Sequence, residues 1–305
     1  MERRNFIKSA LLTAGAFSLP SSRNNLWANR MTEVNASTAA PVFKKSIMWG
    51  TVGMEGTVLD KCKAIKAAGY DGIEPNSHMD REEVLAAMKA TGLMASSVCC
   101  STHWAKPLSD PDPAVRQEGV EGMIVALEDA KAYGTDAVLL VPGTVTDSVS
   151  YDECWSRSVV EIKKLLPVAE KLKITICFEN VWNNFLLSPI EARSYIDQFK
   201  SPYAKFYFDC GNILVYGWPE QWIRILGDKV GRIHIKEFNK QIADKEGRWA
   251  GFGAKLTEGD VNWQAVMKES RAYYKGGWMT TEQGNSNSPE DLKDLGKRLD
   301  KVLAS

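Results

Sequence analysis

The stretch ITICFENVWNN, residues 174–184, decides the fold because an apolar pattern typical of a buried strand ends directly at a carboxylate. Residues 174–178 are mostly apolar, and Glu179 follows them directly. An isolated charge against an apolar interior is costly, so we expect a cation to hold this carboxylate. The same pattern, an apolar run that ends near a polar residue, recurs downstream in FYFDCGN (206–212), RIHIKEF (232–238) and WMTTEQG (278–284).

Short apolar runs alternate with amphipathic helical stretches along most of the chain. The runs that predict strands are residues 46–51, 72–75, 94–101, 137–141, 174–179, 205–209, 232–236 and 278–282. Helix starts are predicted at Asp80, Asp112–Pro113, Ser188–Pro189 and Ser288–Pro289, which carry capping residues and first-turn prolines, and Gly69 is predicted to end the first helix.

Eight strands that alternate with eight helices predict parallel pairing, because each return crossover is a helix. A (β/α)8 barrel, or TIM barrel, typically needs about 250 residues, which suits residues 43–305. The alternative is a doubly wound open sheet with a glycine-rich phosphate loop after its first strand. GTVGMEG, residues 50–56, is rich in glycine but lacks the G-x-G-x-x-G spacing, so the barrel is favoured.

The composition excludes several functional classes. Lys+Arg 38 balances Asp+Glu 38, which leaves no global basic field for nucleic acid or an anionic membrane. Three histidines, at positions 78, 103 and 234, exclude a site built from many imidazoles. The six cysteines form no C-x-x-C pair, and we expect most of them to be free thiols in the core.

The N-terminus predicts export. RRNFIK, residues 3–8, precedes an apolar stretch and a small residue, Ala28, at a plausible cleavage point, as in a twin-arginine signal. We therefore expect residues 1–28 to be an export signal, residues 29–42 a linker, and the mature protein to be periplasmic without membrane insertion. A cytoplasmic protein with a basic tail is the alternative.

Four strand-end residues are candidates for a metal site. In a barrel the carboxyl ends of the strands meet on one face, where active sites lie. The residues are Glu179, Asp209, His234 and Glu282. Three carboxylates and an imidazole would repel one another without a cation, and this donor set suits Mn²⁺, with Mg²⁺, Co²⁺ or Zn²⁺ as options. The lack of a thiolate argues against a structural zinc site.

The motifs FENVWNNFLLSP, YFDCGN, IHIKEF and TTEQG resemble the sugar phosphate isomerase/epimerase family of xylose isomerase-like TIM barrels, which includes tagatose 3-epimerase and xylulose-phosphate 3-epimerase. The resemblance implies that the same four residues bind one divalent metal, and that Glu179 and Glu282 are the catalytic acid and base. Two positions depart from the family: Asn212 stands where some epimerases have histidine, and Glu237 where Asp is frequent.

The chemistry that this site predicts is proton abstraction next to a carbonyl through a metal-stabilised enediolate, as in an isomerase or epimerase of a keto sugar. A lyase or hydratase acting on a 3-keto-glycoside would use the same site, and a non-catalytic sugar-binding barrel is a third hypothesis. A small sugar is the expected partner, and a homo-oligomer is left open. Export argues against a phosphorylated substrate, and the cations Lys106, Arg248 and Lys255 form no compact phosphate motif.

Nine further residues at or near strand ends are predicted to contact the substrate, although each residue type is also common in structural roles. They are Trp49, Glu74, His103, Trp104, Asn180, Trp182, Asn212, Lys236 and Trp249. The longest connection, residues 237–262, is polar and rich in glycine, and it predicts a structureless loop that is functional or mobile.

Overall fold

A computed structural model describes residues 42–284 and 286–305. Nine parallel strands in this part of the chain form one sheet in the order β3-β2-β1-β9-β8-β7-β6-β5-β4. The strands are β1 (Lys44–Met48), β2 (Gly72–Glu74), β3 (Met94–Ala95), β4 (Val98–Cys99), β5 (Ala137–Leu140), β6 (Thr175–Glu179), β7 (Ala204–Asp209), β8 (Val230–Ile235) and β9 (Trp278–Thr281). This arrangement confirms the predicted TIM barrel.

The third predicted strand, residues 94–101, is divided into β3 and β4, and it closes the ring. On one side the Ser96 N–H donates to the Ile73 carbonyl at 2.9 Å, and on the other the Cys100 N–H donates to Leu139 at 3.1 Å. At the division, the Ser96 carbonyl accepts a hydrogen bond from the buried Arg232 guanidinium at 2.8 Å. The sequence alone gave no sign of this partner.

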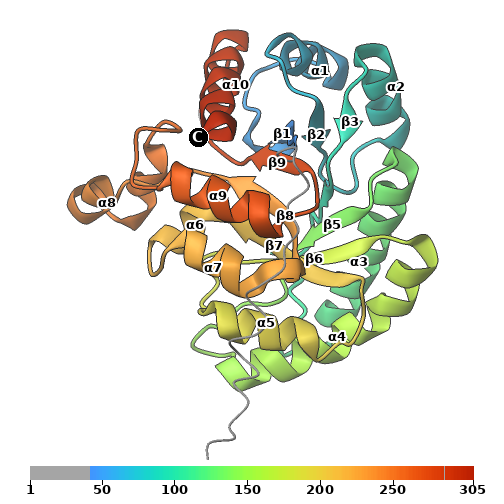
Figure 1. Cartoon of the computed structure of the whole chain (residues 1–305). Coiled ribbons are helices and arrows are strands. Elements are labelled where there is room, and N and C mark those ends of the chain that lie inside the picture. Colours follow the sequence, from blue (N-terminus) through green and yellow to red (C-terminus); the bar gives the residue numbers. More distant parts are fainter. Residues whose placement is uncertain (1–41, 285) are drawn as a thin grey trace, which may run out of the picture. The chain divides into compact units, whose positions relative to one another are not determined.

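Helices surround the strands (Figure 1). They are α1 (Val58–Ala67), α2 (Arg81–Thr91), α3 (Pro113–Tyr133), α4 (Tyr151–Leu172), α5 (Pro189–Asp197), α6 (Cys210–Leu214), α7 (Pro219–Leu226), α8 (Lys240–Glu246), α9 (Trp263–Tyr273) and α10 (Pro289–Ala304). The predicted capping residues Asp80, Asp112, Ser188 and Ser288 each accept a hydrogen bond from a first-turn backbone N–H. Gly69 follows α1 with a φ of 86°, as its predicted role requires.

The long connection 237–262 is not structureless, as the sequence suggested. It contains α8 and a 3₁₀ helix, η3 (Arg248–Gly253). The N-cap of α8 is Asn239, whose side chain accepts from the Ile242 N–H at 3.0 Å. The segment is therefore an ordered element that follows β8, the strand that carries His234.

All six cysteines are buried and free, as expected. Among the described helices none is both long and apolar enough to cross a membrane. The predicted export signal, residues 1–28, and the linker, residues 29–42, lie outside the described residues except for Val42.

Candidate metal centre

Four neighbouring strands bring the predicted ligands together. Glu179 ends β6, Asp209 ends β7, His234 lies in β8 and Glu282 follows β9 directly. The register pairs Asp209 with His234 across β7 and β8, which places both at one level of the barrel. One donor atom from each of the four residues lies within 4.8 Å of the others. This convergence follows from parallel pairing, since all strands end on the same face.

The imidazole of His234 is completely buried and is held on both sides. Its Nε2 lies 2.8 Å from Glu74 Oε2, and its Nδ1 lies 2.8 Å from Glu179 Oε1. Glu74 is also fully buried and accepts from the Ser97 hydroxyl at 2.6 Å. When Glu74 accepts the Nε2–H, the Nδ1 lone pair is directed at the carboxylate cluster, as a metal ligand requires. Glu74 thus supports a site residue, and its expected contact with a substrate stays a prediction.

Two buried oxygens test whether the cluster suits a cation. Asp209 Oδ2 and Glu282 Oε2 are buried and have no hydrogen-bond partner within the described part of the chain. Glu282 Oε2 does lie 3.0 Å from His234 Nδ1, outside hydrogen-bonding geometry. Buried acceptors without donors are rare because each costs desolvation energy. Carboxylate oxygens with free lone pairs, beside an imidazole nitrogen, are a fitting donor set for a divalent metal ion.

One cation, the side chain of Lys236, lies beside this cluster. Its ammonium lies 3.0 Å from Glu282 Oε1 and 3.8 Å from Asp209 Oδ2. It therefore points to the same side as His234, as the strand period predicts. Its contacts include the two carboxylates themselves, and its role toward a substrate stays a prediction.

The environment separates the pKa values of the two glutamates. Burial, followed by the charge of Glu282, raises the pKa of Glu179 to about 7. Burial alone would raise the pKa of Glu282, but the Lys236 ammonium and His234 lower it below the usual range. Burial also raises the pKa of Asp209 well above its ordinary value. Two carboxyl groups with separated pKa values are the usual arrangement of an acid and a base.

Asn180 and Asn212 are tied to the backbone beneath the cluster. The Asn180 amide accepts from the Asp209 N–H and donates to the Asp209 carbonyl, both at 3.1 Å. The Asn212 amide donates to the Asn180 carbonyl at 2.9 Å. The pair fixes the ends of β6 and β7, and the predicted contacts of both residues with a substrate stay predictions.

His103 and Trp104 follow β4. His103 is buried, its Nδ1 accepts from the Val141 N–H at 3.4 Å, and burial lowers its pKa to about 4. Trp104 packs edge-on against it and is 55% exposed. Trp49 lies in η1 (Trp49–Thr51), under the Lys61 ammonium at 5.6 Å. Substrate contacts by these three residues stay predictions.

Three aromatic side chains form a continuous surface beside the cluster, which we call the aromatic shelf: Trp182, Trp249 and Phe252. The ring centroids of Trp182 and Trp249 are 4.4 Å apart, and those of Trp182 and Phe252 are 4.6 Å apart. The two tryptophans were predicted as substrate contacts from the sequence, whereas Phe252 was not. Its position in RWAGFG, between two glycines of a segment expected to be a loop, was the available signal.

Glu237 and Gln283 anchor the segment that carries Trp249 and Phe252. The Glu237 carboxylate is fully buried and accepts four hydrogen bonds, from the N–H groups of Phe238, Thr257 and Val261 and the indole of Trp263. Gln283 accepts from the Glu237 N–H at 2.8 Å and donates to the Phe252 and Ala254 carbonyls. The residue that departs from the family pattern is therefore a structural anchor.

We expect Glu237→Gln to destabilise the fold by about 3 kcal/mol, because the amide nitrogen would face N–H donors that need an acceptor. For a chain of this size the loss corresponds to a fall in Tm of about 6–12 °C, measured by thermal denaturation. Glu246→Gln, at an exposed position of α8, is the control and should leave the Tm unchanged. A wild-type Tm for Glu237→Gln would contradict the anchoring role.

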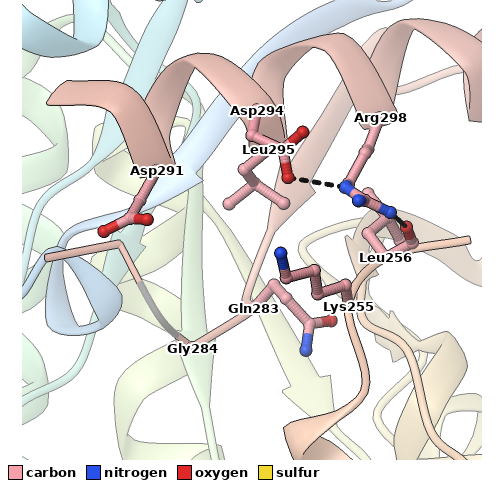
Figure 2. A pocket seen from close by; sticks show the side chains of 8 residues that line it. All are labelled: Lys255, Leu256, Gln283, Gly284, Asp291, Asp294, Leu295 and Arg298. Carbon is pink, nitrogen blue, oxygen red and sulfur yellow. Dashed lines mark hydrogen bonds and ion pairs between the residues drawn. The ribbon is translucent and has the colours of Figure 1, made fainter. Parts of the chain in front are cut away.

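A small pocket lies beside Gln283 and Gly284, and Figure 2 shows its lining. Its volume is about 60 Å³, far below the roughly 300 Å³ at the lower end of ligand sites. Arg298 on its wall is held by Asp294 at 2.7 Å and by the Leu256 carbonyl at 3.0 Å. The pocket is therefore too small for a sugar. Lys255, one of the three cations considered above for phosphate binding, lies there beside the acidic residues Asp291 and Asp294.

Comparison with known proteins places this geometry in context. Residues 62–302 match the family described as xylose isomerase-like TIM barrel. The L-ribulose-5-phosphate 3-epimerase UlaE of Escherichia coli O1:K1 is 28% identical over 195 residues, which cover 59% of this chain and 68% of that protein.

Two solved structures share the fold. The 3-keto-D-glucoside 4-epimerase YcjR from E. coli has a TM-score of 0.73 at 18% identity, over 86% of this chain and 100% of that one. An L-ribulose 3-epimerase has a TM-score of 0.72 at 15% identity, over 86% and 95% of the two chains. At these sequence identities, the similarity shows a shared fold and no more.

Proposed function

The chain belongs to the family of xylose isomerase-like TIM barrels, and from this premise we propose that it is a metal-dependent epimerase of a keto sugar. The observation that carries the proposal is the convergence of Glu179 and Glu282 on His234 Nδ1, at 2.8 and 3.0 Å. The names of the relatives support it, since L-ribulose-5-phosphate 3-epimerase and 3-keto-D-glucoside 4-epimerase both invert a carbon centre of a sugar.

The residues proposed to hold the metal are Glu179, Asp209, His234 and Glu282. A divalent ion bound there, with Mn²⁺ as our first choice, would supply Lewis acidity toward the carbonyl oxygen and the neighbouring hydroxyl. Glu74 holds the imidazole, and the Asn180–Asn212 pair holds the backbone that carries Asp209. The protein thus fixes the orientation of its donor atoms before a substrate arrives.

The two glutamates move the proton. Glu282 accepts the proton from the carbon next to the carbonyl, and the electron pair of the broken C–H bond moves to the carbonyl oxygen. Glu179 donates a proton to the other face of the same carbon. The C–H bond is re-formed with inverted configuration, and nothing is oxidised or reduced overall.

Exchange with solvent tests the reaction. Purified protein with Mn²⁺ is incubated with a panel of keto sugars and keto-glycosides in D2O, and C–H loss and products are followed by NMR. Deuterium incorporation with an inverted centre and an intact carbon skeleton is the expected result. Release of an aglycone would assign a lyase instead, and the absence of exchange with every member of the panel would reject the enzymatic proposal in favour of a sugar-binding protein.

We expect the affinity for Mn²⁺ to fall as the pH drops below 7. The pKa of Glu179 is about 7 and that of Asp209 is raised, so protons occupy these ligands at lower pH and must be displaced. Each displaced proton should weaken binding about tenfold per pH unit. Calorimetry between pH 5.5 and 8, in buffers of different ionisation enthalpy, measures both Kd and the protons released. A Kd that does not change over this range would exclude these residues as ligands.

Export to the periplasm stays part of the proposal. Its evidence lies in residues 1–28, outside the described structure. Fractionation of cells that produce the full chain, compared with a variant in which Arg3 and Arg4 are replaced by lysine, tests it. Retention of the wild-type chain in the cytoplasm would reject export.

A further inference from the structure

We propose that the aromatic shelf, Trp182, Trp249 and Phe252, binds a second sugar ring, so that the preferred substrate is a keto-glycoside. The inference rests on the proposed function and deepens it, because it names the substrate class. A free keto monosaccharide would occupy only the carboxylate cluster and leave the outer shelf unused.

The shelf is continuous with the reacting groups. The Lys236 ammonium, 3.0 Å from Glu282 Oε1, lies 4.8 Å from the ring centroid of Phe252. Phe252 packs on Trp182, and Trp182 packs on Trp249. A substrate whose carbonyl lies at the carboxylates therefore meets this apolar surface as soon as it extends past Lys236.

The outer end of the shelf is open to solvent but fixed in position. Trp249 is 70% exposed. Trp182 beneath it donates its indole N–H to the Asn212 carbonyl at 3.4 Å. The Asn239 N–H donates to the Gly251 carbonyl at 2.9 Å, which ties η3 to the start of α8. An exposed aromatic surface that is already ordered loses little entropy when a ligand covers it.

The chemistry of the shelf suits the apolar C–H face of a sugar ring. Aromatic faces supply large contact area with a polar edge, and Arg248 places its guanidinium 5.3 Å over the Trp182 ring, where its donors can reach ring hydroxyls. A phosphate would need several free cations. Lys236, a second cation beside the shelf, is paired with Glu282, and Lys106 is paired with Glu118 at 2.5 Å.

Calorimetry with two probes tests the shelf on the Mn²⁺-loaded full chain: the 3-keto derivative of cellobiose, and the 3-keto derivative of methyl β-D-glucoside. We expect the disaccharide to bind at least tenfold more tightly. In Trp249→Ala the ratio of the two Kd values should fall toward one, while Trp249→Phe should retain most of it. Trp218→Ala is the control, because Trp218 is 61% exposed and lies outside the shelf, and its ratio should equal that of the wild type.

The outcomes separate the two proposals. Equal affinity for both probes in the wild-type protein, or an unchanged ratio in Trp249→Ala, would overturn the shelf even where D2O exchange proceeds. Tighter binding of L-ribulose 5-phosphate than of the keto-disaccharide would also overturn it. A ratio that depends on Trp249, combined with no solvent exchange, would leave the shelf standing and reject the epimerase.

Discussion

Replacing either Glu179 or Glu282 by glutamine is expected to lower the rate of proton exchange by about 1000-fold or more, since each removes one partner in general acid–base catalysis. The amide keeps the size of the side chain, and both positions are anchored by strands whose register does not depend on them. The effect should appear in kcat for both epimerisation directions, because Glu179 and Glu282 exchange roles when the reaction runs backward.

The measurement is the initial rate of deuterium incorporation, with metal content determined for each variant. Metal content matters because both residues are also proposed ligands, and exchange should be compared at saturating Mn²⁺. Glu246→Gln, on the exposed side of α8, is the matched control and should retain the wild-type rate. Full activity in either active-site variant at saturating metal would break the assignment of acid and base.

Asp209→Asn is expected to weaken Mn²⁺ binding by at least about 100-fold, since even residues behind a metal ligand typically contribute 10–100-fold to affinity. The two oxygens of Asp209 have different tasks. Oδ1 caps α6 by accepting from the Asn212 N–H at 2.6 Å, whereas Oδ2 is buried and has no hydrogen-bond partner among the described residues. The asparagine side chain can keep the helix cap but lacks the negative charge, so the substitution should act mainly by weakening metal binding.

Calorimetry and the metal-induced shift in Tm measure this effect. A ligand at 100 times its Kd stabilises the folded state by about 2.7 kcal/mol, so Mn²⁺ should raise the Tm of the wild type and not that of Asp209→Asn. Asp209→Ala removes cap and ligand together and should also lower the Tm without metal. Equal Mn²⁺ affinity in Asp209→Asn and wild type would remove Asp209 from the metal site.

The roles of individual polar residues were harder to predict than their positions. Glu74 and Asn180 stand at strand ends, as substrate-binding residues do, but the structure places one behind His234 and the other against the backbone of Asp209. Glu237, which stands where Asp is frequent in the family, anchors the segment that follows it. In each case the deciding partner is distant in sequence; Glu74 and His234 are 160 residues apart.

The sequence by itself determined the barrel and the convergence of Glu179, Asp209, His234 and Glu282. Strand and helix periods are local properties, and parallel strands necessarily end on one face, so residues at those ends meet without further information. Only the tertiary structure decided which polar group each of them faces, how the 237–262 segment is ordered, and that Phe252 joins two tryptophans. These contacts depend on packing between elements that are far apart in the chain, and no local pattern encodes that packing.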